Sequence, residues 1–179
     1  MANEQAIGSG RGNHWRIAGW GFAASLLLLP FLAMRFTNEV EWTASDFVVA
    51  AVLLGSVGFA FELTVRKSGN LAFRLGAATA VIATFLTIWV NGAVGMIGSE
   101  GNLYNLLFGG VLLIALAGAI TARFQAAGMA RAMVLAAIAQ AVVGAGGLSL
   151  DALGGILSVG FAAPWLLSSW LFRKAARQA

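Results

Sequence analysis

Charged residues alternate in sign along the short loops that separate the long apolar runs of this chain. Loops with Lys and Arg are followed by loops with Asp and Glu, and Arg35 is the single cation in an acidic loop. Cytoplasmic loops of membrane proteins retain an excess of Lys and Arg. The alternation therefore predicts six membrane crossings with both termini inside. The cations that mark the predicted inner side are Arg11, Arg16, Arg66, Lys67, Arg74, Arg123, Arg131, Arg173, Lys174 and Arg177.

Six apolar runs are each close to the roughly 20 residues that a helix needs to cross a bilayer. Their apolar character on all sides, with many Gly and Ala residues, favours helices over barrel strands. We expect an all-α polytopic membrane protein, a bundle of six transmembrane helices with N-in/C-in topology. The spans are predicted at about 17–34, 46–65, 73–98, 104–122, 130–150 and 152–172. Residues 1–16 are then a cytoplasmic arm, 17–172 a single transmembrane domain and 173–179 a basic cytoplasmic tail.

Composition excludes several kinds of site. The chain has no Cys, so it offers no thiolate nucleophile and no ligand for an iron–sulfur cluster. It has one His, His14, so paired-histidine haem ligation is also excluded. No cofactor is predicted. The formal charge of +4 does not indicate nucleic-acid binding, because the cations are spread in twos and threes along one side of the bilayer.

Three polar residues inside the predicted spans are candidates for a transport path: Glu62, Asn91 and Gln140. Intramembrane carboxylates are functional candidates by default, although Arg66, one turn after Glu62, favours an ion pair. Gln140 lies nine residues after Arg131, which places it about 14 Å into the bilayer core. An interhelical hydrogen bond is the simpler role for Gln140 and Asn91, and a substrate contact is the alternative.

The predicted outer loops hold the densest group of polar side chains. Clustered carboxylates and amides can hold a hard cation such as Ca²⁺, and the identity of any metal stays open. Asp46 and Asn105 also suit helix N-terminal positions, where their side chains accept hydrogen bonds from free backbone N–H groups. Capping and a salt bridge from Arg35 would account for most of the group without a ligand. The predicted outer-face cluster is Arg35, Glu39, Glu41, Asp46, Glu100, Asn102 and Asn105.

Glycines recur every third residue at the end of the third predicted span, at Gly92, Gly95, Gly98 and Gly101. In a helix this spacing gives a slowly drifting stripe along which a neighbouring helix can approach closely. Tight helix packing is the expected role. The alternative is an unwound end of the span whose freed carbonyl groups face a cavity.

Two segments resemble those of small, uncharacterised bacterial inner-membrane proteins. They read MRFTxEVxW at residues 34–42 and VGxIGSExN at residues 94–102. The resemblance covers roughly residues 34–105 and includes Glu62 with the basic pair at 66–67. It implies a bacterial inner membrane. It carries over no functional residue, because no activity is known for that group.

Three functions are compatible with these features. Six spans, short loops and polar residues at graded depths favour, narrowly, a small-solute or ion transport-like bundle, alone or as a homo-oligomer. The first alternative is a non-catalytic accessory subunit that packs in a larger membrane complex through Gly- and Ala-rich helix faces. The second is a membrane enzyme that acts on lipid through Glu39, Glu41 or Glu100. It is the weakest, because the sequence shows no nucleophile–base pair or metal-ligand set, and no catalytic residue is predicted.

Overall fold

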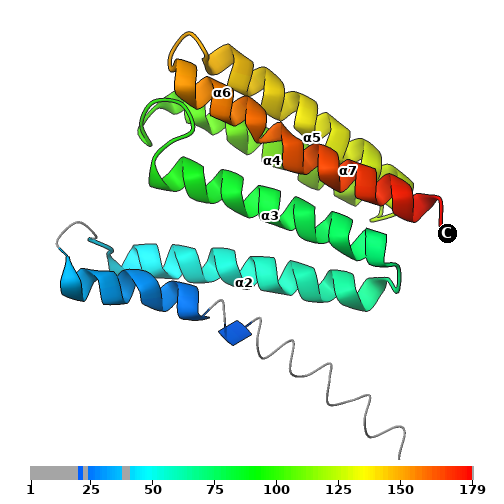
Figure 1. Cartoon of the computed structure of the whole chain (residues 1–179), viewed down its shortest axis with the longest axis horizontal. Helices are drawn as coiled ribbons and strands as arrows, with labels where there is room; N and C mark the ends of the chain where they lie inside the picture. Colours follow the sequence, from blue (N-terminus) through cyan, green and yellow to red (C-terminus); the bar gives the residue numbers. More distant parts are fainter. Residues whose placement is uncertain (1–19, 22–23, 38–40, 179) are drawn as a thin grey trace, which may run out of the picture. The chain divides into compact units, whose positions relative to one another are not determined.

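The computed structural model describes residues 20–21, 24–37 and 41–178, and every regular element within these residues is helical. A helix over Ala24–Phe36 is followed by α2 (Ala44–Lys67), α3 (Leu71–Ala93), the short 3₁₀ helix η1 (Leu103–Asn105), α4 (Leu106–Thr121) and α5 (Ala126–Gly147). The last two helices are α6 (Ala152–Gly160) and α7 (Ala162–Ala176) (Figure 1). The predicted all-α class is confirmed for this part of the chain.

Four helices are long and apolar enough to cross a membrane: Leu71–Ala93, Leu103–Thr121, Ala126–Gly147 and Ala152–Ala176. Two shorter apolar helices cover Ala24–Phe36 and Ala44–Ala60. These helices support a membrane protein, while six crossings and the side of each terminus stay predictions. The predicted cytoplasmic arm at 1–16, with Arg11, His14 and Arg16, lies outside the described residues.

The chain divides into two compact units, Met1–Ala60 and Phe61–Ala179. Aromatic contacts are a feature of the first unit. The ring of Phe47 meets the rings of Phe31 and Trp42 edge to face, at centroid distances of 6.5 and 5.2 Å. Aromatic pairs prefer this geometry because the positive ring edge meets the negative ring face. These contacts join the helix over Ala24–Phe36 to the start of α2.

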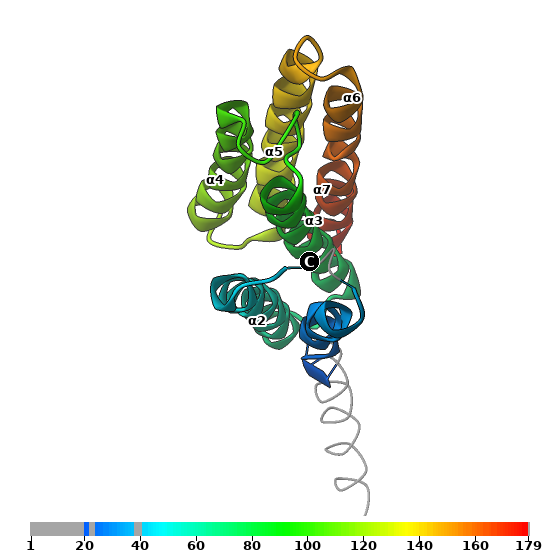
Figure 2. The ribbon, with the colours of Figure 1, turned by 90° about the vertical axis from the view of Figure 1, so that its left-hand side faces the viewer.

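The second unit is a helical bundle arranged around α5. This helix packs against α4 on one side and against α6 and α7 on the other, and α3 packs against α7 (Figure 2). Lipid tails are as apolar as leucine, so a bundle in a membrane is held by van der Waals packing and not by exclusion of water. Many alanines surround the largest fully buried side chains, which are Trp165, Phe108, Phe172, Ile97 and Met133.

Glycines let the helices of the second unit approach closely. A Cβ atom on Gly144 of α5 would lie 2.7 Å from the backbone nitrogen of Val159 in α6. A Cβ atom on Gly118 of α4 would lie 2.5 Å from the Cβ atom of Ala132 in α5. Both spacings are too short for a side chain, so α5 is held against both neighbours at positions where only glycine fits.

The last predicted span is interrupted near its middle. α6 ends at Gly160, Phe161 adopts a turn conformation and α7 begins at the next residue. Pro164 lies in the first turn of α7 and has no N–H to donate to the carbonyl of Gly160. Proline breaks or kinks a helix for this reason and because its ring crowds the preceding turn. The two helices together are still long enough to cross a bilayer.

The third predicted span is shorter than expected, because α3 ends at Ala93 and not near Gly98. Gly95 and Gly98 have positive φ angles of 76° and 69°, which a right-handed helix does not contain. Only Gly92 of the predicted stripe is helical. The stripe along one helix face was therefore wrong, and the alternative of an unwound end describes this segment better.

Candidate functional site

Residues 94–102, between α3 and η1, fold back into the end of the bundle, and we call them the end loop. Ile97 is fully buried and Met96 is only 5% exposed, although neither belongs to a helix. Glycines provide the space for them. A Cβ atom on Gly147 would lie 2.5 Å from Cδ1 of Ile97, and one on Gly154 would lie 2.6 Å from the carbonyl oxygen of Met96. The end loop therefore lies against both α5 and α6.

Asn105 holds the shape of the end loop. Its side chain is 4% exposed, and its Oδ1 accepts a hydrogen bond from the backbone N–H of Ile97 at 2.9 Å. Its Nδ2 donates to the carbonyl oxygens of Ser99 at 2.8 Å and Ile97 at 3.3 Å. The side chain makes no capping hydrogen bond to α4, so its predicted role as a helix cap was wrong. The amide instead replaces the backbone partners that a loop inside a bundle lacks.

Two further asparagines reinforce this arrangement. Asn91, on α3, donates from Nδ2 to the backbone carbonyl of Asn105 at 3.0 Å. Asn102 caps η1 by accepting from the N–H of Tyr104 at 3.0 Å, and it donates to the carbonyl of Ile97 at 3.2 Å. The structure thus brings together one predicted transport residue, Asn91, and two members of the predicted outer-face cluster. All three make hydrogen bonds to the backbone around the end loop.

Three backbone carbonyl groups of the end loop accept hydrogen bonds from side chains. The carbonyl of Met96 accepts from Oγ of Ser158, in α6, at 3.4 Å. Those of Ile97 and Ser99 accept from the asparagine amides described above. Backbone polar groups need such partners at membrane depth, because lipid supplies none. The carbonyls of Met96, Ile97 and Ser99 are therefore hydrogen-bonded within the bundle.

Asp151 joins the end loop to α6 and was not among the predicted site residues. Its carboxylate accepts from the N–H groups of Gly154 and Gly98, both at 3.0 Å. These hydrogen bonds, that from Gly154 first, hold the pKa of the Asp151 carboxyl below its usual value. An aspartate directly before an apolar run is a common sign of a helix N-terminus, and this sign could have identified it.

Stability is expected to fall at acid pH through this carboxylate. A carboxyl group whose pKa is lowered in the folded state stabilises the fold above its unfolded pKa of about 3.9. This stabilisation is lost as the pH falls through the lower folded value. We expect the melting temperature in detergent to fall more steeply below about pH 4 for the wild type than for Asp151→Asn. Parallel melting curves from pH 7 to pH 3 would rule out this role.

Gln140 is fully buried between α5 and α6. Its Nε2 donates to the carbonyl of Ser158 at 3.1 Å, while its Oε1 has no hydrogen-bond partner among the residues that the structure describes. The same end of α5 is also tied to η1, because the hydroxyl of Tyr104 donates to the carbonyl of Val143 at 2.8 Å. Gln140 thus forms the interhelical hydrogen bond that was one of its two predicted roles.

Gln140→Leu is expected to change the free energy of unfolding by less than about 1 kcal/mol, since interhelical hydrogen bonds in membranes average about 0.6 kcal/mol. Leucine has a similar volume and removes the unpaired Oε1 atom. Gln125→Leu, at an exposed position before α5, is the matched control. Unfolding of both variants in mixed micelles, followed by circular dichroism, measures the difference. A loss above about 3 kcal/mol at Gln140 alone would contradict the modest value.

The remaining members of the predicted outer-face cluster belong to different parts of the chain. In the first unit, Glu41 is exposed, and the Arg35 guanidinium carbon lies 5.4 Å from the centre of the Phe31 ring. Glu39 lies outside the described residues, and the predicted salt bridge of Arg35 stays a prediction. In the second unit, Glu100 is exposed on the end loop.

Asp46 caps the start of α2, as predicted. Its Oδ2 accepts hydrogen bonds from the backbone N–H and the hydroxyl of Thr43, at 2.7 and 2.8 Å. Asp46 is the third residue of the helix, and this backbone contact is one half of a capping box. The cap fixes where α2 begins, and the prediction is confirmed.

Glu62, in α2, is half-buried. Its predicted ion pair with Arg66 stays a prediction, because the Arg66 side chain lies outside the described part of the structure. Arg74, in the first turn of α3, donates from Nε to the carbonyl of Ser68 at 2.7 Å. This bond helps to hold the turn between α2 and α3.

The chemistry available at the end loop is that of hydrogen-bonded amides, the Asp151 carboxylate and the exposed Glu100 carboxylate. Within the described residues, no group of three His, Asp or Glu side chains could hold a metal ion. The hydrogen bonds and buried side chains described above hold the end loop against the end of the bundle. Comparison with protein-family models, curated proteins and solved structures finds no match for this chain.

Proposed function

We propose that this protein is a multi-pass protein of a bacterial inner membrane, with six spans and both termini in the cytoplasm. It serves as a non-catalytic subunit that packs in a larger membrane assembly. The observation that carries this role is that polar side chains inside the bundle form hydrogen bonds within the bundle itself. The side-chain amides of Asn91 and Gln140 donate to backbone carbonyls of their own bundle. This proposal therefore gives two of the three candidate transport residues a structural role.

The distribution of charge over the second unit supports the proposed topology. Asn70, before α3, donates to Gln178 at 3.3 Å, and Ser169 of α7 donates to the carbonyl of Ala130 in α5 at 2.8 Å. These contacts gather the start of α3, the start of α5 and the end of α7 at one end, which we call the basic end. Glu100 and Asp151 lie at the opposite end of the unit, beside the end loop. The cations of the basic end are Arg74, Arg123, Arg131, Arg173, Lys174 and Arg177. Positive residues accumulate on the cytoplasmic side.

Compartment-specific labelling of tags on the two termini tests the topology. Both tags are expected to react only from the cytoplasmic side of intact cells. Reaction of the two tags from opposite sides would exclude an even number of crossings. Reaction of the C-terminal tag from the outer side would remove the assignment of the basic end to the cytoplasm.

Native mass measurement after gentle detergent extraction tests the assembly role. The chain is expected in a particle that contains other polypeptides and that falls apart in a harsher detergent. The harsh extract provides the control, because it shows the mass of the chain with only detergent bound. A lone monomer in both extracts would contradict the assembly role.

Transport is the second candidate, and the interruption between α6 and α7 favours it. Broken helices inside a membrane are common at substrate sites of transporters. The interruption is a kink in the helix next to Gln140. Three buried polar atoms have no hydrogen-bond partner among the described residues: Gln140 Oε1, Asn91 Oδ1 and Trp165 Nε1. Flux into proteoliposomes that is lost in Gln140→Leu but kept in Gln125→Leu would favour transport over the assembly role.

A further inference from the structure

The last two turns of α7 present a basic stripe beside a hollow of about 450 Å³. The residues that line the hollow are Trp170, Arg173, Lys174, Arg177 and Gln178. Arg173 and Lys174 follow Trp170 by three and four positions, so they lie on the same face of α7, while Arg177 caps the helix and Gln178 follows it. Three cations and one tryptophan therefore converge on a single open hollow at the basic end of the second unit.

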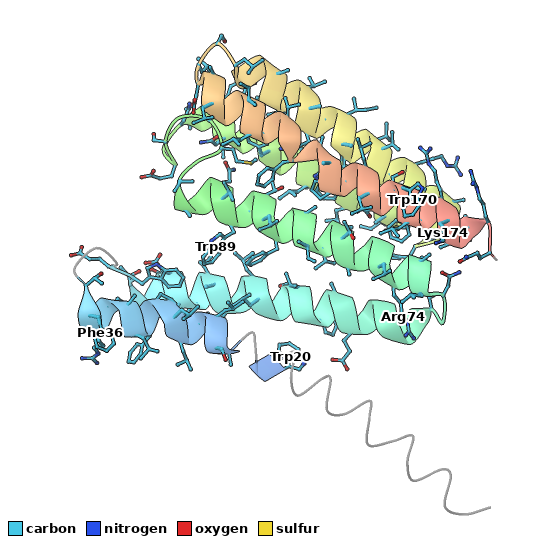
Figure 3. The ribbon with its side chains drawn as sticks, in the orientation of Figure 1. Trp20, Phe36, Arg74, Trp89, Trp170 and Lys174 are labelled. Carbon is cyan, nitrogen blue, oxygen red and sulfur yellow. The ribbon has the colours of Figure 1, made fainter. Side chains whose placement is uncertain are left out.

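The aromatic and basic members of the stripe contact one another. Nζ of Lys174 lies 5.6 Å from the centre of the Trp170 ring, and the two side chains lie side by side near the end of α7 (Figure 3). Trp170 is 57% exposed, which is unusual for so large an apolar ring unless it faces lipid or a partner. Gln178 is held by the hydrogen bond from Asn70 across to the start of α3. This hydrogen bond therefore connects the edge of the hollow to the start of a neighbouring helix.

The hollow lies where a bilayer interface is expected. α7 is the second half of the span Ala152–Ala176, and the stripe occupies the end of this span. Tryptophan settles at the level of lipid headgroups, and Lys or Arg beside it attract anionic lipid. Glu100 and Asp151 lie at the opposite end of the unit, and Glu62 is on α2. A phosphate group at the stripe would therefore meet three cations of the same helix.

We propose that this stripe binds the phosphate headgroup of an anionic phospholipid, with the Trp170 ring against the glycerol and upper acyl region. Arg173 and Arg177 supply planar donors that can hold phosphate oxygens in pairs. Lys174 adds a point charge above the ring. Cations in the last turn of a helix also complement its dipole, but that effect requires neither the tryptophan nor the hollow. The inference does not depend on the assembly role proposed above.

Lipid titration followed by native mass spectrometry tests this site on the full chain in detergent. The first bound lipid is expected to be phosphatidylglycerol in preference to phosphatidylcholine of the same acyl length. Arg173→Gln/Arg177→Gln is expected to weaken that first binding step about thirtyfold, since each surface cation contributes about a factor of five. Arg123→Gln/Arg131→Gln removes the same charge from the same end and is expected to change it less than about threefold. Trp170→Leu is expected to weaken it several-fold.

Three results would overturn the site. Equal losses in the two double variants would show that diffuse charge, and not the stripe, attracts the lipid. Equal binding of phosphatidylcholine would remove the need for an anion. Displacement of bound phosphatidylglycerol by inorganic phosphate would identify a free-anion site in place of a lipid site. Arg173→Lys/Arg177→Lys keeps the charge but not the planar donors, so it is expected to bind more weakly than the wild type and more tightly than Arg173→Gln/Arg177→Gln.

Discussion

Asn105→Ala is expected to lower the free energy of unfolding by about 2–4 kcal/mol, because it leaves the buried N–H of Ile97 without its acceptor and removes two further hydrogen bonds of the end loop. The buried N–H of Ile97 would lose its acceptor, whereas the carbonyl of Ser99 would keep a second donor, the N–H of Asn102 at 3.0 Å. An unsatisfied buried group costs about 1–3 kcal/mol, which exceeds the value of the bond that is lost. Unfolding in mixed micelles, followed by circular dichroism, measures the change.

Asn102→Ala is the matched control for this prediction. Asn102 is half-buried, and its partners are the N–H of Tyr104 and the carbonyl of Ile97, which Asn105 also contacts. Loss of a capping side chain costs about 0.5–2 kcal/mol. We expect the Asn105 variant to be clearly the less stable of the two. The reverse order would show that the end loop is held by its apolar side chains and not by the Asn105 amide.

Asn105→Asp separates the accepting from the donating function of this side chain. A carboxylate can still accept from the N–H of Ile97, but it cannot donate to the carbonyl of Ser99. Burial of a charge beside a carbonyl oxygen is unfavourable, so this variant is expected to be at least as unstable as Asn105→Ala at neutral pH. Wild-type stability of Asn105→Asp would contradict the hydrogen-bond assignment.

Helix positions could be predicted from the sequence because apolar length is a local property. The predicted starts at residues 46, 73 and 104 fall within two residues of α2, α3 and η1. The end of α3 could not be predicted in this way. Residues 94–97 include Val, Met and Ile, so hydropathy continues the span, while the positive φ of Gly95 ends it. Glycine spacing alone does not distinguish a helix face from a loop.

Polar residues were predicted correctly where their partners are adjacent in sequence. Asp46 caps α2 through Thr43, three residues away. Asn105 looked equally suitable as a cap, but its partners are backbone groups of a loop that has folded back on itself. That fold depends on Gly147 and Gly154, which lie more than 40 residues later and leave room for Ile97 and Met96. Such long-range complementarity cannot be read from local pattern.

Gly95→Ala is expected to be among the most destabilising substitutions in the second unit, with a loss of about 2–5 kcal/mol. Two costs add at this position. An L-residue at φ 76° is strained by about 1–2 kcal/mol. The new Cβ atom would also lie 2.5 Å from the backbone carbonyl carbon and oxygen of Ser99, and 2.8 Å from Nδ2 of Asn105. Backbone atoms cannot move aside without opening the loop, so overpacking adds about 1–3 kcal/mol.

The chain offers a graded series that separates these two costs. Gly98 has a positive φ of 69°, but its nearest neighbour would be the Asn102 amide at an ordinary 3.4 Å, so Gly98→Ala is expected to cost only about 1–2 kcal/mol. Gly101 has open space around it, and Gly101→Ala is expected to stay within about 0.5 kcal/mol of the wild type. Melting temperatures in one detergent should rank the variants Gly101→Ala, Gly98→Ala and Gly95→Ala in falling order. Equal stability of the Gly95 and Gly98 variants would mean that backbone strain alone shapes the end loop. A wild-type melting temperature for Gly95→Ala would exclude the folded-back loop itself, because a methyl group at that position and the Ser99 carbonyl cannot occupy the same space.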